Sequence, residues 1–186
     1  MYSHYEQAEQ YLRDQVKVPY SPPDVVQALS KKFNFHTVEE GKQFEIEGIK
    51  VNSHRMRHPG GCSAFSFEIY GKKFVYATDV ELKSTDYSKP QKGGEVFKNA
   101  DAIVIDSQYT VEEVYRKENW GHSAFCYAID FAVYWNIKKV YLFHHEPAYD
   151  DKKLNSILQA ARWYAQYITH SDVEVNLAKE TQEITL

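Results

Sequence analysis

Imidazole and carboxylate side chains gather where strand-like runs of this sequence end. His58 follows IKVNSHRM, Asp79 follows KKFVYAT, and His144 and His145 follow KVYLF, while His122 comes just before a helical stretch. Loops that follow strand ends are where layered α/β proteins place their functional residues. Imidazole and carboxylate are also natural ligands for zinc, manganese or iron. The pattern predicts a metal site built at one edge of a sheet.

Each of these residues taken alone has a simpler explanation. A single histidine at a strand end is more often a hydrogen-bonded edge residue than a ligand, and Asp79 or Asp106 alone is more often a turn residue. The segment from His144 to Pro147 could be only a polar strand exit. What favours a metal site is the repetition of the same event after several hydrophobic runs.

The middle of the chain has the two-residue periodicity of β-strands. FNFHTV, QFEIEG, IKVNSHRM, SAFSFEIY and KKFVYAT alternate or cluster apolar and β-branched residues, with glycines between the runs. Tyr70-Gly71-Lys72 between two such runs predicts a hairpin. Consecutive strands of an antiparallel or mixed sheet are therefore expected, followed by a polar surface loop over residues 80–97.

The later part of the chain alternates strands and helices. ADAIVID, KKVYLF and VEVNLA read as strands, with helices expected near residues 121–135 and 151–168. This order is typical of α/β proteins, here a layered α+β arrangement. We expect one domain over 1–186, with a helical N-terminal segment over 1–33 and the sheet and motifs over 34–186. The N-terminal segment should hold a helix near 4–16 and another after Pro22-Pro23, with Val25, Val26 and Leu29 on one face.

Composition excludes several classes of protein. The net charge of −4 gives no bulk attraction to nucleic acid or anionic lipid. Cys62 and Cys126 form no CxxC pair, so a disulfide framework is not expected and a reducing cytoplasm is the default. No apolar run approaches a membrane span, and the N-terminus does not have the pattern of a signal peptide. A globular cytoplasmic protein is expected.

Five short motifs in a fixed order resemble the later part of a metallo-β-lactamase-fold hydrolase. They are HPGG, VYATD, DSQYT, WGHS and FHHEP, and the resemblance covers residues 34–150. The most similar group contains ribonuclease Z and cyclic-nucleotide or phosphonate-ester phosphodiesterases. The resemblance implies the C-terminal part of an αββα sandwich and hydrolysis of a phosphodiester.

The same resemblance implies a role for each residue. Three side chains match the family's metal ligands, with a carboxylate bridging two divalent ions, zinc or manganese: His58, Asp79 and His144. His122 matches a catalytic histidine that donates a proton or contacts the transition state. Three further residues match positions that orient the ligands: Asp106, His145 and Glu146.

The family's HxHxDH cluster, which supplies most ligands of the first metal, does not occur in this sequence. The resemblance therefore implies that the first sheet and its ligand loop are missing, and that the isolated chain binds metal weakly or not at all. An uncovered sheet face or edge favours a homodimer. Three interpretations stay open: a hydrolase completed in a longer or partnered form, an inactive remnant or binding module, and a chain that holds one structural metal. An RNA or small-molecule phosphodiester, a cyclic nucleotide and a thioester remain candidate substrates.

Overall fold

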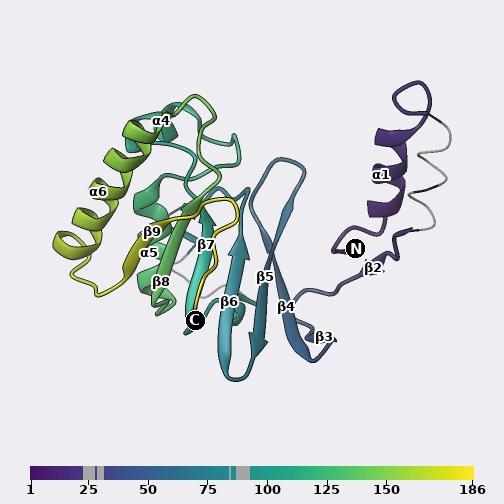
Figure 1. Ribbon diagram of the computed structural model, residues 1–186, viewed down its shortest axis with the longest axis horizontal. Coiled ribbons are helices and arrows are strands. Elements are labelled where there is room, and N and C mark those ends of the chain that lie inside the picture. The colour runs from purple at the N-terminus through teal and green to yellow at the C-terminus, as the bar shows by residue number, and fades with distance from the viewer. Residues whose placement is uncertain (23–27, 29–31, 84, 87–92) are drawn as a thin grey trace.

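A mixed seven-stranded sheet forms the body of the chain, in the order β3-β4-β5-β6-β7-β8-β9 (Figure 1). The computed structural model describes residues 1–22, 28, 32–83, 85–86 and 93–186. Strands β3 to β6 pair antiparallel and β6 to β9 pair parallel, so the predicted mixed sheet is confirmed. The strands are β3 (Phe44–Ile46), β4 (Ile49–Met56), β5 (Cys62–Ile69), β6 (Lys72–Ala77), β7 (Ala102–Asp106), β8 (Lys139–Phe143) and β9 (Glu174–Leu177).

The hairpin predicted at Tyr70-Gly71 is confirmed. Ile69 pairs with Lys72 across a two-residue turn, in which Tyr70 has a φ of 52° and Gly71 a φ of 73°. Positive φ at both central residues is the type I′ geometry, whose twist matches that of the flanking strands. The turn fixes the register of β6 and thereby the point at which Asp79 leaves the sheet.

Helices cover one face of the sheet, with α5 (Phe125–Tyr134) and α6 (Asp151–Tyr167) close to the predicted ranges. Small residues on these helices let them approach the sheet, where branched residues of the parallel strands fill the core. A third helix, α4 (Val111–Arg116), was not predicted. Its start is marked by a capping box between Thr110 and Glu113, a signal that was present in the sequence.

The opposite face of the sheet is aromatic, and none of the helices that the structure describes covers it (Figure 1). Phe67 of β5 and Phe74 of β6 are directly paired, with ring centroids 6.4 Å apart, and both side chains are only partly buried. Further along this face, Ile184 and Leu186 of the C-terminal segment pack against the cluster of Ala102, Val104 and Tyr141. The expected homodimer would use this face, and it stays a prediction.

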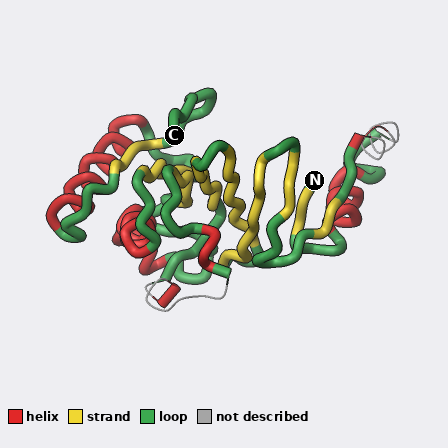
Figure 2. Tube along the Cα trace, turned by 90° about the horizontal axis from the view of Figure 1, so that it is seen from below, coloured by secondary structure: helices red, strands yellow, loops and turns green. Residues whose placement is uncertain are grey.

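The N-terminal region lies beside β3 and β4, away from the helical layer (Figures 1 and 2). β1 (Tyr2–Ser3) pairs in parallel with β2 (His36–Thr37), and the predicted first helix is shorter than expected, running as α1 (Ala8–Val16). The second predicted helix, with Val25, Val26 and Leu29, lies outside the described residues. None of the helices that the structure describes has the length and apolar character of a membrane span.

The prediction of a surface loop after Asp79 is wrong for both ends of that segment. Val80, Glu81 and Leu82 are at most 4% exposed, and Phe97 is 2% exposed. The 3-10 helix η1 (Gly94–Val96) precedes Phe97. The prediction failed because it was made from polar composition. Glu81, the polar residue near the start of the segment, is buried and accepts hydrogen bonds from the protein backbone instead of from water.

Candidate metal centre

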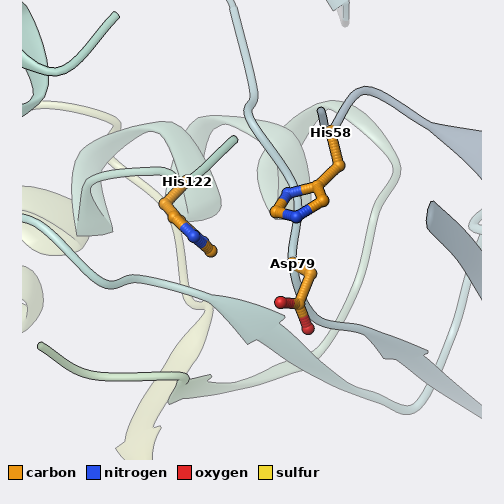
Figure 3. A group of neighbouring side chains, drawn as sticks. All are labelled: His58, Asp79 and His122. Carbon is orange, nitrogen blue, oxygen red and sulfur yellow. The ribbon is translucent and has the colours of Figure 1, made fainter. Parts of the chain in front are cut away.

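The side chains predicted to bind metal lie together where strands leave the sheet. Asp79 follows β6 and His144 follows β8, and these two strands flank β7 in parallel, so their ends meet at one edge. The ligand atoms of His58, Asp79 and His122 all lie within 4.8 Å of one another (Figure 3). His144 joins them, with its Nε2 3.4 Å from Asp79 Oδ1.

The ring of His58 is oriented by a backbone carbonyl. Its Nδ1 lies 2.9 Å from the oxygen of Gly121, so the tautomer that donates there leaves Nε2 available as a ligand. Gly121 has a φ of 97°, and a Cβ built on it would lie 2.3 Å from His58 Nδ1. Only glycine allows this close approach.

A buried glutamate holds the segment that carries this carbonyl. Glu81 is 4% exposed, and its carboxylate accepts hydrogen bonds from the backbone nitrogens of Asn119 at 3.1 Å and Gly121 at 2.9 Å. Lys83 Nζ lies 3.3 Å from the same carboxylate and compensates its charge. Glu81 therefore positions His58 through Gly121, a role that was not predicted from the sequence.

Ser123 ties the segment after Asp79 to the site. Its hydroxyl donates to the carbonyl of Val80 at 2.5 Å and accepts from the backbone nitrogen of Leu82 at 2.9 Å, and the side chain is fully buried. These two bonds fix the chain on one side of Asp79 while β6 fixes it on the other. The carboxylate of Asp79 is thus carried on a rigid support, which is a requirement for a ligand.

Asp106 at the end of β7 orients His122. The fully buried carboxylate lies 2.7 Å from His122 Nδ1 through Oδ2. It also accepts backbone hydrogen bonds from Val80 at 3.2 Å, Gln108 at 3.1 Å and Ser123 at 3.0 Å. With Nδ1 bonded to Asp106, the other ring nitrogen of His122 is available toward His58 and Asp79.

The pKa of His122 is raised above its ordinary value of 6.5. Burial disfavours the charged ring, but the hydrogen bond that His122 donates to Asp106 and the negative charges of Asp106 and Asp79 outweigh it. The shift favours the protonated ring, which is the form that can donate a proton.

Asp79 and His144 both adopt left-handed backbone conformations, each with a φ of 56°. This region is sparsely populated by residues other than glycine, although aspartate, asparagine and histidine enter it more readily than most. Such strain of about 1–3 kcal/mol persists where the surrounding structure imposes it, often at functional sites. Here the left-handed conformation places the two side chains next to each other, with His144 Nε2 3.4 Å from Asp79 Oδ1.

His145 and Glu146 lie in environments that differ from each other. His145 is partly buried, and desolvation lowers its pKa while the backbone of Ser107 and Leu142 opposes the shift. Glu146 pairs with Lys117 at 3.2 Å rather than with a candidate ligand. Their predicted orienting role stays a prediction, whereas Asp106 contacts His122 directly.

The donor set fits a divalent ion of borderline hardness. The imidazoles and the carboxylate are ligands that zinc and manganese both accept. The bonds that occupy Nδ1 of His58 and of His122 are the supporting contacts that metal-binding histidines have. Among the described residues, two groups have ligand atoms close enough to share one ion: His58, Asp79 and His122, and Asp106, His122 and His144. The predicted ligand set of His58, Asp79 and His144 stays a prediction.

The match to known proteins agrees with this geometry. The family model described as the beta-lactamase superfamily domain matches residues 3–145, which is most of the chain. The chain belongs to this family. Together with the sheet and its helical layer, this confirms the metallo-β-lactamase fold and places the chain in a family of hydrolases.

Ribonuclease Z of Picrophilus torridus is 29% identical over 90 residues, covering 47% of this chain and 28% of its own length. The short form of human tRNase Z superposes with a TM-score of 0.60 at 16% identity, covering 99% of this chain and 66% of that one. Zinc-bound PqqB from Methylobacterium extorquens superposes with a TM-score of 0.61 at 14% identity, covering 100% of this chain and 61% of that one. The chain thus spans less than two thirds of the length of each of these proteins.

Proposed function

We propose that this chain contributes His58, Asp79 and His144 to a divalent-metal centre that hydrolyses phosphodiesters, with His122 as the proton donor. The observation that carries the proposal is the hydrogen bond between Asp106 and His122. It holds the His122 ring where its ligand atom lies within 4.8 Å of those of His58 and Asp79. The similarity to ribonuclease Z and tRNase Z, enzymes named for RNA, supports a phosphodiester substrate.

A bound divalent ion would neutralise charge on the phosphate and lower the pKa of the attacking water. The residues of the chain supply the proton and hold the ligands in place. Asp106 holds the His122 ring in one tautomer and stabilises its protonated form, so that Nε2 can give its proton to the leaving oxygen. Gly121 and Glu81 fix the ring of His58, which keeps the ligand set preorganised.

The second candidate function is that of a binding module, which has the fold but does not hydrolyse a substrate. It is favoured by one observation, the lack of an HxHxDH sequence to complete the ligand set. In that case His58, Asp79 and His144 would hold an ion weakly or not at all. The two functions differ in a property that is measured directly, the stoichiometry and strength of metal binding.

The experiment combines metal analysis with turnover of bis(p-nitrophenyl) phosphate in zinc- or manganese-supplemented buffer. We expect bound metal and metal-dependent turnover in the natural chain, with both lost in Asp79→Ala and His58→Ala. His122→Ala should keep the metal but lose about 100- to 10,000-fold in the turnover of a dinucleoside phosphodiester, because its alkoxide leaving group needs a proton from a general acid. Turnover of bis(p-nitrophenyl) phosphate should fall much less, because p-nitrophenolate leaves as a stable anion.

His36→Ala is the matched control, because His36 is exposed in β2 and stacks on Tyr2 away from the site. It should behave as the natural chain does. A chain that binds no metal and has no turnover would contradict the hydrolase and leave the binding module.

A further inference from the structure

The segment from Lys117 to Gly121 joins α4 to His122 and carries an exposed tryptophan. The Trp120 side chain is 62% exposed, next in sequence to the glycine that contacts His58 and two residues before His122. The segment is held in place, because Glu81 accepts hydrogen bonds from the backbone on both sides of Trp120. The indole is thus presented to solvent from a fixed backbone at the rim of the site.

A lysine lies among aromatic rings at the same rim. Lys117 Nζ lies 4.1 Å from the ring centroid of Tyr109 and 5.9 Å from that of Trp120. Glu146 holds the same ammonium at 3.2 Å. The Tyr109 ring in turn meets the His122 ring edge to face, with centroids 5.8 Å apart. These contacts connect Trp120 to the proposed proton donor through packed side chains.

Exposure alone does not make a tryptophan functional, and the chain contains a comparison. Trp163 on α6 is 55% exposed, but its ring lies 5.8 Å from Tyr167 on the outer surface of that helix. Trp120 differs in its location beside the candidate ligands and in the cation next to its ring. An aromatic face together with a cation is the combination that binds a planar base linked to a phosphate.

We propose that Trp120, supported by Lys117, stacks on a nucleobase attached to the phosphodiester that lies at His58, Asp79 and His122. This rests on the proposed function and narrows its substrate to a nucleotidyl phosphodiester. Stacking on an indole tolerates any base, because every base has a π face. The subsite would therefore select a nucleotide over an alkyl phosphate without reading its sequence.

The test compares binding of adenosine 5′-monophosphate and ribose 5-phosphate by calorimetry, which needs no turnover. The natural chain should bind the nucleotide about tenfold more tightly than the sugar phosphate. Trp120→Leu should bind both equally, whereas Trp120→Phe should keep most of the preference. Trp163→Leu, the matched control, should keep all of it.

Two results would overturn the subsite: no preference in the natural chain, or a preference that Trp120→Leu retains. The outcome is separable from that of the hydrolase. A Trp120-dependent preference without turnover of bis(p-nitrophenyl) phosphate would support the subsite and reject the hydrolase. Turnover of that substrate without a preference for the nucleotide would support the hydrolase and reject the subsite.

Discussion

Two clusters of histidines and carboxylates in this chain differ in how accessible their imidazole nitrogens are. The candidate metal centre places His58 and His122 beyond the ends of regular elements, each with Nδ1 bonded to a fixed acceptor. The second cluster lies at β4 and includes His4 and His54, both 5% exposed. Residue type is the same in the two clusters, but His4 and His54 are buried whereas His58 and His122 are only partly buried, so residue type alone does not identify the site.

The second cluster is enclosed by its own partners. His54 Nδ1 lies 2.9 Å from Glu40 Oε1, at an angle that makes no hydrogen bond, and its ring meets Phe97 edge to face. His4 Nδ1 accepts from Arg55 Nε at 3.4 Å, and the His4 carbonyl accepts from the same guanidinium at 3.2 Å. This cluster joins the N-terminal segment to the sheet. His4 Nε2 and His54 Nδ1 are unpaired among the described residues but buried, so the difference teaches that a site needs ring nitrogens that are accessible as well as unpaired.

The largest expected effect comes from Gly121→Ala. The new Cβ would lie 2.3 Å from His58 Nδ1 and 2.5 Å from the Pro59 ring, so the His58 ring must move. Losing an orienting contact of a ligand weakens metal affinity about 10- to 100-fold. Calorimetric titration with zinc measures this.

Gly48→Ala provides the control, because Gly48 also has a positive φ, of 84°, but a Cβ there meets nothing within 4 Å. Both variants should lose about 1–2 kcal/mol of stability from the backbone conformation. Only Gly121→Ala should lose affinity for metal. Equal zinc affinities in the two variants would remove the basis for placing His58 in the metal centre.

A smaller effect is expected from Glu40→Ala in the second cluster. The substitution removes the acceptor of the Arg55 backbone N–H, 3.0 Å away, and the carboxylate beside His54. Unfolding in urea should show a loss of about 0.5–1 kcal/mol, the net contribution of one hydrogen bond, because water can replace the acceptor at this exposed position. Zinc affinity should not change. If it fell as far as in Gly121→Ala, the two clusters would not be distinct in function.

The fold and the candidate ligands were predictable because their signals are local. Alternating residues predicted the strands. His58, Asp79 and His144 were singled out because each follows an apolar run, and their role as ligands came from the family resemblance and stays a prediction. Glu81 was missed because its partners Asn119 and Gly121 are 38 and 40 residues away, and nothing near it in sequence indicates burial.

The left-handed backbones of Asp79 and His144 were not predictable for a related reason. A positive φ is suggested by glycine in a sequence, whereas here the tertiary structure imposes it on other residues. The helix α4 is a different case. Thr110 and Glu113 form its capping box, and that spacing was available from the sequence and overlooked.

The smallest effect, on pH dependence, should have opposite signs in the two clusters of the metal-free chain. Burial lowers the pKa of His4, and the charge of Arg55 lowers it further. The unfolded chain then binds a proton that folded His4 does not, so its contribution to stability is present above pH 6.5 and is lost as pH falls below that value.

His122 has the reverse linkage, because Asp106 raises its pKa against the effect of burial. Its contribution to stability is fully present below pH 6.5 and is lost as pH rises through the higher pKa of the folded state. Histidine ring signals in NMR titrations with a chelator present should show His122 titrating above 6.5 and His4 below it. Asp106→Asn removes the charge that protonated His122 faces, so the His122 midpoint should fall while that of His4 stays. Midpoints of both rings that coincide in the natural chain would show that the two clusters do not differ electrostatically.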